Sequence, residues 1–465
     1  MMRKVMIPKI LLNNQFRNQK IKKRMRHKLT LLLIIGTFFA VNGQMKKWTL
    51  EECVIYAVDN NLTVEQSELD LENAKIDESD ALGALIPNLN GSTTVSSNTG
   101  LSFNPATNEP TTNTIFNVSA GLSSNLTLFD GLRNFKRIQR AKLNGIANQY
   151  RLEDIKDDIR LSVANAYLQV LSNKEALKVS KAQYAVTEQD LKRTKELVES
   201  GVSPRGDLLE IEATAASQEQ QVVNNESLVL ISRVNLAQLM QITDYENFDT
   251  AEESFDIPVS DILSNSPKVI FDKALGFRND IKFSETNVDL ASKDLEIAKG
   301  ARYPTITGFF NYNTRYSDQN TPLGGFFDQL YIFDGISYGA QLNVPIFNGW
   351  NARNNVRRAK INVDISKIQL DQQKLELETN IQQAYVDVNT FLKAYEAAEK
   401  TLEARRLAYD YAKERFDVGL MNSFDFSQAQ SRLDNAEASV VRTKYDYIFR
   451  LKILEFYFGI PLSLN

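Results

Sequence analysis

Residues 163–198 read VANAYLQVLSNKEALKVSKAQYAVTEQDLKRTKELV, and an apolar side chain returns at every seventh position of this stretch. The same spacing recurs in three further segments. The positions concerned are Val163, Val170, Leu177, Tyr184, Leu191 and Val198; Leu208, Ala215, Val222, Val229 and Leu236; Ile381, Val388, Tyr395, Leu402, Tyr409 and Phe416; and Phe426, Leu433, Val440, Tyr447 and Leu454. Such a repeat is typical of helices packed along one another in a coiled coil. A helix of about 70 residues would extend about 105 Å, which predicts a coiled coil or an α-helical tube rather than a compact bundle.

The two halves of the chain carry the same motifs in the same order. Residues 126–131 read LTLFDG, and residues 344–349, 218 positions later, read VPIFNG. Other matching pairs are Pro87 with Pro304, Ala166-Tyr167 with Ala384-Tyr385, Gly201 with Gly419, and Asp207 with Asp425. A fixed spacing indicates internal duplication. We expect a first repeat at residues 44–242, an exposed acidic connector at 243–267 and a second repeat at 268–465.

Each half alternates between the helical pattern and a period of two. Apolar residues alternate with small polar ones around residues 116–128, 305–316 and 338–346, and more weakly at 89–103. This pattern fits strands between lipid and water, and it equally fits a half-buried sheet in a soluble protein. The expected strands are about 89–103, 114–129, 305–316 and 337–347; the expected long helices are about 131–200, 207–240, 349–418 and 425–457.

The first 43 residues have the features of a secretory signal peptide. They hold ten Lys and Arg residues and no Asp or Glu, and they end in an apolar run at 29–41 followed by Gly43. The run is short for a transmembrane helix, which needs about 20 residues. We therefore expect export and cleavage after Gly43, with either Met1 or Met25 as the true start.

Composition excludes several classes of function. The chain has one Cys and one His, and His27 lies in the leader, so a disulfide framework, a multi-cysteine metal site and a histidine-based triad are excluded from the exported chain. Without the leader, 44 Lys and Arg face 58 Asp and Glu, a net charge of −14 that disfavours nucleic-acid binding. We expect no metal, no cofactor and no catalytic residue.

The strand count constrains how such a chain could cross a membrane. No stretch after the leader has 18 consecutive apolar residues, so a membrane-spanning part would have to be a β-barrel. Four strands cannot close a barrel, which needs about eight or more. The chain is therefore expected to oligomerise and to share one transmembrane barrel among its copies.

The ordered, duplicated set of motifs resembles the TolC-like outer-membrane efflux family. The resemblance covers residues 44–465 and includes the two strand-to-helix turns at 129–131 and 347–349 and the hairpin turns GVSPRGD at 201–207 and GLMNSFD at 419–425. It implies a mixed α and β membrane protein: a homotrimer with a shared outer-membrane barrel and a long coiled-coil tunnel in the periplasm of a Gram-negative type bacterium. It also implies export without catalysis, together with a periplasmic adaptor protein and an inner-membrane pump of the resistance-nodulation-division or ABC type.

The resemblance places the periplasmic tip and a candidate gate at the hairpin turns. The residues concerned are Gly201, Arg205, Asp207, Phe416, Gly419, Asp425 and Gln428. Asp207 and Asp425 each begin a return helix, where an acidic residue caps the helix, and three copies of Asp425 could also form a cation-selective ring. Phe416 and Met421 stand where the best-known member has its gating Tyr and Arg, and Gln428 replaces a second Asp. Arg205 is the candidate substitute for that closing network.

Two other readings of the sequence remain open. A purely structural coiled-coil protein of the periplasm or cell surface would bury its strands in a soluble sheet without a pore. A secreted hydrolase has little support, because the exported chain has no His and no nucleophile motif. The exported substrate cannot be identified from the sequence.

Overall fold

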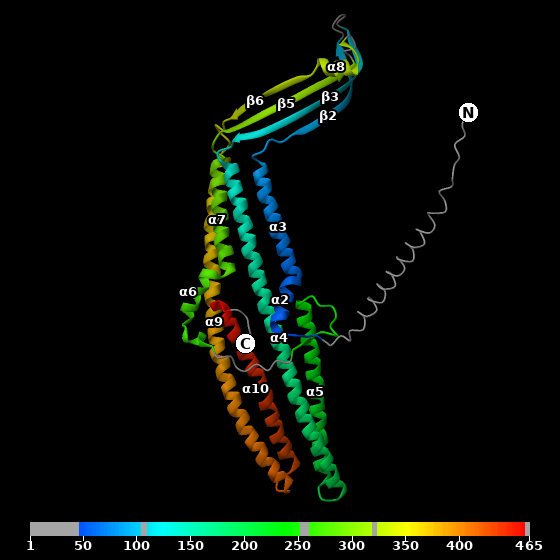
Figure 1. Cartoon of the computed structure of the whole chain (residues 1–465), viewed down its shortest axis with the longest axis vertical. Coiled ribbons are helices and arrows are strands. Elements are labelled where there is room, and N and C mark those ends of the chain that lie inside the picture. Colours follow the sequence, from blue (N-terminus) through cyan, green and yellow to red (C-terminus); the bar gives the residue numbers. More distant parts are fainter. Residues whose placement is uncertain (1–45, 104–108, 252–259, 319–322, 461–465) are drawn as a thin grey trace, which may run out of the picture.

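The computed structural model describes residues 46–103, 109–251, 260–318 and 323–460. The predicted signal peptide, residues 1–43, lies outside the described residues. The molecule is an elongated rod with a four-stranded sheet at one end and two helical hairpin turns at the other (Figure 1).

The two halves contain helices of matching length in the same order. Those of the first half are α2 (Leu50–Asn60, 11 residues), α3 (Leu62–Gly83, 22), α4 (Arg133–Glu199, 67) and α5 (Arg205–Leu239, 35). Those of the second half are α6 (Pro267–Phe277, 11), α7 (Asn279–Gly300, 22), α9 (Asn351–Asp417, 67) and α10 (Ser423–Phe458, 36). Figure 1 shows α4 and α9 running the whole length from the sheet to the turns, while α3 and α7 cover only the half near the sheet.

The heptad positions lie where helices contact one another. Every apolar position of the seven-residue repeat is buried or half-buried in the folded chain, and none is exposed. Two core clusters lie near the middle of the rod, where the short helices meet the long ones. The first contains Cys53, Tyr167, Leu236 and Ile448, and the second contains Ile270, Ile281, Ile381 and Leu451.

The sheet is antiparallel throughout, in the order β2 (Asn90–Phe103), β3 (Pro110–Phe129), β5 (Thr305–Ser317) and β6 (Gly335–Asn343). Its central ladder pairs Val118 with Tyr316 and Leu122 with Tyr312, which puts these apolar side chains on one face. Ser119 pairs with Arg315 on the opposite, polar face. One edge of β2 and one edge of β6 have no strand partner among the described residues.

The fourth expected strand ends earlier than the alternation indicated. β6 stops at Asn343, whereas the sequence predicted a strand to 347. Pro345 follows two residues later and has no N–H for a ladder hydrogen bond, so the ladder ends before it. The loop before β6 also contains a short helix, α8 (Phe326–Ile332), that the sequence did not predict.

The expectation of an exposed connector at 243–267 was wrong for part of that segment. Phe248, Thr250 and Ile262 are buried, and the short strand β4 (Asp249–Thr250) pairs in parallel with β1 (Lys47–Trp48). The segment also contains a 3-10 helix, η1 (Asp261–Ser264). The acidic composition suggested exposure, but large apolar residues such as Phe248 and Ile262 still pack against the helices.

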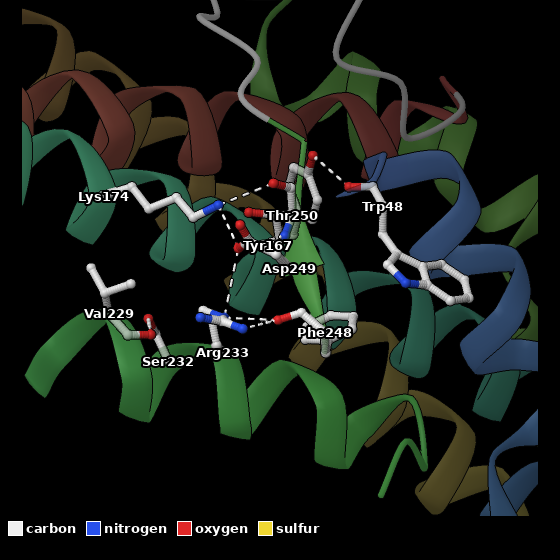
Figure 2. A network of polar contacts seen from close by, with 9 residues as sticks. All are labelled: Trp48, Tyr167, Lys174, Val229, Ser232, Arg233, Phe248, Asp249 and Thr250. Carbon is white, nitrogen blue, oxygen red and sulfur yellow. Dashed lines mark hydrogen bonds and ion pairs between the residues drawn. The ribbon is translucent and has the colours of Figure 1, made fainter. Parts of the chain in front are cut away.

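Charged side chains hold this strand in place (Figure 2). Asp249 Oδ1 forms an ion pair with Lys174 Nζ of α4 at 2.6 Å and lies 3.6 Å from Arg233 Nε of α5. Lys174 also donates to the Thr250 carbonyl at 3.0 Å, and Arg233 Nε donates to the Phe248 carbonyl at 2.9 Å. The network joins the connector to both helices of the first hairpin.

Candidate functional site: the hairpin tips

Both long helices end in the same hydrogen-bonded turn at the far end of the rod. The Gly201 N–H donates to the Val198 carbonyl at 3.0 Å, and the Val202 N–H donates to Leu197 at 2.9 Å. The second turn repeats both bonds: the Gly419 N–H donates to the Phe416 carbonyl at 3.0 Å, and the Leu420 N–H donates to the Arg415 carbonyl at 2.8 Å. These are the two bonds of the Schellman motif, in which the glycine adopts a left-handed conformation; φ is 75° at both positions.

Asp425 is exposed and takes part in a reciprocal helix cap. Its backbone N–H donates to Asn422 Oδ1 at 2.8 Å, and the Asn422 amide donates back to Asp425 Oδ2 at 2.9 Å. The helix N-terminus favours a negative charge at this place. Asn422 is therefore the N-cap of α10, and Asp425 is its partner in the first turn, with the carboxylate open to solvent.

Asp207 is used differently, because it joins the two hairpins. Ser423, at the start of α10, donates its hydroxyl to Asp207 Oδ1 at 2.7 Å. A second link close by is the ion pair of Arg193 on α4 with Asp417 on α9, at 2.7 Å. The side chain of Arg205, the candidate partner named from the sequence, is exposed and makes no hydrogen bond or ion pair with any described residue.

Two aromatic residues near the tip of the second hairpin, Phe416 and Phe426, stack on each other. The rings of Phe416 and Phe426 are parallel within 3°, with centroids 4.5 Å apart. Phe426 is fully buried, and Phe416 is half-buried. Phe416 thus joins α9 to α10 by ring stacking. It has no hydroxyl group with which to form the hydrogen bonds that a tyrosine could make at this position.

A row of polar side chains continues the contact between hairpins away from the tip. The contacts are Thr214 with Ser427 at 3.2 Å, Gln218 with Asp434 at 2.7 Å, Gln430 with Thr187 at 2.6 Å, and Gln183 with Glu437 at 2.9 Å. We call this set the polar seam. The sequence analysis missed it, because a polar residue beside a heptad position looks like a solvated face.

A groove of about 620 Å³ opens beside the polar seam, between α4, α5 and α10. It is lined mostly by small or polar side chains, among them Gln183, Gln218, Gln428 and Asp434. The exposed Gln428 therefore faces this groove.

Burial shifts the pKa values of two carboxyl groups in this region. Burial raises the pKa of Asp434 to about 6. The hydrogen bond from Gln218 lowers this pKa in part, and the nearby charge of Glu437 raises it further. Burial also raises the pKa of Asp190, which Lys413 opposes. Asp190 Oδ2 is buried and accepts no hydrogen bond from the described residues. Asp434 of the polar seam and Asp190 of α4 are therefore both carboxyl groups in a poorly hydrated setting.

The described ranges hold no group of three or more His, Cys, Asp or Glu side chains suited to a metal ion. In the same residues, no helix combines the length and the apolar character that crossing a bilayer requires.

Comparison with known proteins assigns the family. The family model described as "Outer membrane efflux protein" matches residues 56–240 and 270–459, most of the chain. The chain belongs to this family. Outer membrane efflux proteins are located in the outer membrane, and the family is one of efflux and secretion channels rather than of enzymes.

Individual relatives are distant. Outer membrane protein TolC of Vibrio cholerae serotype O1 is 23% identical over 291 residues, 62% of this chain and 64% of that protein, which is less than two thirds of its length. Outer membrane efflux protein BepC of Brucella suis biovar 1 is 20% identical, over 90% of this chain and 86% of that protein. The CmeC outer membrane channel of Campylobacter jejuni has the same fold, with a TM-score of 0.77 at 19% identity over 88% of this chain and 85% of that one.

Proposed function

We propose that this outer membrane efflux protein works as a homotrimer, with four strands from each protomer closing one transmembrane barrel. The helices continue from the barrel as a tunnel through the periplasm. The observation that carries the proposal is the four-stranded sheet, which has one apolar face and, within the described ranges, no strand paired to the outer edges of β2 and β6. Unpaired backbone groups are costly in lipid, and joining the β6 edge of one protomer to the β2 edge of the next removes them.

The proposal includes an internal duplication and two kinds of partner. The matched helix lengths and the repeated motifs support an origin from two copies of one unit. A tunnel open to the periplasm needs a source of substrate, so we propose docking to a periplasmic adaptor protein and an inner-membrane pump of the resistance-nodulation-division or ABC type.

Mass and conductance test the channel directly. Native mass spectrometry of the detergent-purified protein should give three chains, and the same sample should conduct ions in planar bilayers. A monomer would contradict the shared barrel. A trimer that conducts neither as the unmodified protein nor with the Ser423–Asp207 and Arg193–Asp417 links removed would instead favour the structural coiled-coil protein.

At the tip, we propose that two intrachain links hold the hairpins together in the closed state: Ser423 with Asp207, and Arg193 with Asp417. Both connect the first hairpin to the second within one protomer. The double variant Arg193→Ala/Ser423→Ala should raise conductance in planar bilayers while trimers still form. Arg205→Ala is the matched control, because the Arg205 side chain is exposed and makes no hydrogen bond or ion pair with the described residues. Equal conductance in the two variants would exclude the links as the closing device.

Three copies of Asp425 are proposed to favour cations at the tunnel entrance. Asp425→Asn should then lower the preference for cations in planar bilayers without preventing trimer assembly. The reciprocal cap with Asn422 predicts a modest stability loss of about 1 kcal/mol or less from the same change. Unchanged ion selectivity would leave Asp425 with the capping role alone.

A further inference from the structure

The short helix α8 is fixed to the end of the sheet by hydrogen bonds. Gln329 is fully buried; its Oε1 accepts from the Ser317 N–H at 3.0 Å, and its Nε2 donates to the Gly324 carbonyl at 3.2 Å. Thr314 of β5 donates its hydroxyl to the Leu330 carbonyl at 2.5 Å. The helix is therefore held in one orientation on the strand.

α8 lies over the apolar face of the sheet. Besides the Ser317 N–H, two side chains of β5 contact it, Thr314 and Tyr316, which alternate along the strand with Asn313 and Arg315 of the polar face. The ring of Tyr316 lies 5.0 Å from that of Phe326, the first residue of α8. Figure 1 places α8 at the end of the sheet away from the long helices.

The outward side of α8 is aromatic and unusually exposed. Phe327 and Tyr331, four residues apart on one side of the helix, are 80% and 82% exposed. The apolar surface continues onto β6, where Ile336 and Tyr338 are 64% and 80% exposed. Two aromatic rings exposed beside an apolar sheet face indicate a surface that contacts an apolar neighbour.

We propose that α8 is a lipid anchor of the outer leaflet, in which Phe327 and Tyr331 lie among acyl chains at the boundary with the headgroups. The inference rests on the proposed function, since it requires the sheet to span the membrane. An aromatic ring with a polar tip suits this boundary, and aromatic girdles flank the apolar band of membrane barrels. Here a helix in the loop between β5 and β6 supplies the rings, beyond those carried by the strands.

The position of α8 favours lipid over a second copy of the chain. Neighbouring protomers would join at the edges of β2 and β6, in the plane of the sheet. α8 instead lies over a face, and that face is the apolar one, continuous with Tyr338.

Site-directed spin labelling tests the anchor. Cys53, the one cysteine of the chain, is fully buried, so a nitroxide should label an introduced cysteine selectively. We would label Phe327→Cys and Tyr331→Cys in phosphatidylcholine vesicles and measure collisions with oxygen, which concentrates in lipid, and with a water-soluble nickel chelate. Tyr338→Cys and Ser337→Cys are the matched controls, because these neighbours on β6 point to opposite faces of the sheet.

The anchor predicts an oxygen-to-nickel collision ratio at residues 327 and 331 close to that at residue 338 and several-fold higher than at residue 337. A ratio like that of residue 337 would overturn it, because α8 would then lie in water. Low collision rates with both reagents would also overturn it, because protein would then cover the helix. Equal ratios at residues 337 and 338 would show that the sheet does not separate lipid from water, and the proposed function would fail together with the anchor.

Discussion

At the level of single residues, the two strand-to-helix turns share a backbone but differ in their surroundings. Gly131 and Gly349 are equivalent in the two repeats and have φ values of 73° and 61°. A Cβ atom added at Gly131 would lie 2.3 Å from the Gly300 carbonyl oxygen, whereas one added at Gly349 would meet no atom within 4 Å. The first turn is therefore packed against the end of α7, and the second is open.

This difference predicts unequal effects of the same substitution. Gly349→Ala should cost about 1 kcal/mol, the penalty for a side chain in the left-handed region. Gly131→Ala should cost about 2 kcal/mol more, because the backbone must also move away from Gly300. Thermal unfolding followed by circular dichroism would compare the two variants. Equal losses would show that the close approach to Gly300 has no energetic weight.

The raised pKa of Asp434 gives the polar seam a pH dependence. Burial favours the neutral carboxyl, so the folded chain binds a proton more tightly than the unfolded chain does. The resulting stability is complete below the ordinary value of 3.8 and is lost as the pH rises through about 6. Lowering the pH from 7 to 5 should therefore raise the melting temperature through this group.

The variant Asp434→Asn isolates that contribution. It should show a smaller rise in melting temperature between pH 7 and pH 5 than the unmodified protein, since it has no carboxyl group to protonate. Asp410→Asn, at an exposed position on α9, is the control. If the two variants respond equally to pH, Asp434 does not carry the effect.

The sequence pattern predicted the apolar heptad positions but not the buried polar residues beside them. Thr187 and Thr194 are 1% and 3% exposed, although a polar residue next to a seam is ordinarily solvated. Their burial depends on which hairpin lies opposite: Thr187 meets Gln430, which is 243 positions away in the chain. A single-helix pattern carries no information about such a contact.

At the level of elements, the connector strand β4 depends on one carboxylate. Asp249 lies between Lys174 and Arg233, whose side chains are 20% and 17% exposed (Figure 2). Asp249→Asn would leave two half-buried cations without their shared carboxylate and should lower stability by about 2–4 kcal/mol. Glu246→Gln, an exposed change in the same connector, should alter it by about 0.5 kcal/mol or less. Chemical denaturation would measure both, and a similar small effect at Asp249 would contradict the network's importance.

The ends and short elements were less predictable than the long helices. A periodic segment of 67 residues repeats its pattern many times, whereas α8 has seven residues and β4 has two. α8 exists because Gln329 bonds to the backbone of β5 and of its own loop, and these are contacts that local composition does not encode. The tip turns could be found because glycine at the end of a helix has a specific backbone role. The Asp207–Ser423 and Arg193–Asp417 links could not, since they join different hairpins.

At the scale of the whole molecule, the two hairpins must have equal length for their tips to meet. Deleting one heptad from each arm of one hairpin, residues 184–190 and 215–221, would shorten it by about 10 Å. The Arg193–Asp417 and Ser423–Asp207 contacts should then be lost, and conductance should rise. Deleting residues 402–408 and 433–439 as well should bring the tips level again.

Small-angle scattering and planar-bilayer conductance would check this series. The variant that lacks all four segments should be about 10 Å shorter than the unmodified protein. Its conductance should be closer to that of the unmodified protein than is the conductance of the variant that lacks only residues 184–190 and 215–221. If the variant that lacks only residues 184–190 and 215–221 conducts like the unmodified protein, contact between the hairpin tips does not restrict the tunnel entrance.

The β3–β5 ladder has a consequence for the order of folding. It pairs Val118 with Tyr316, about 200 positions apart, whereas β2–β3 and β5–β6 join strands that follow each other in the chain. Closing so long a loop is slow compared with forming a hairpin. When the chain is exported N-terminus first, the β2–β3 pair forms before β5 is available. The β5-facing edge of β3 then stays unpaired until residues 130–304, which separate the two strands and include α4 and α5, have followed. Protection of that waiting edge from other chains is therefore a requirement of biogenesis, and an interrupted synthesis would leave an aggregation-prone hairpin rather than half a channel.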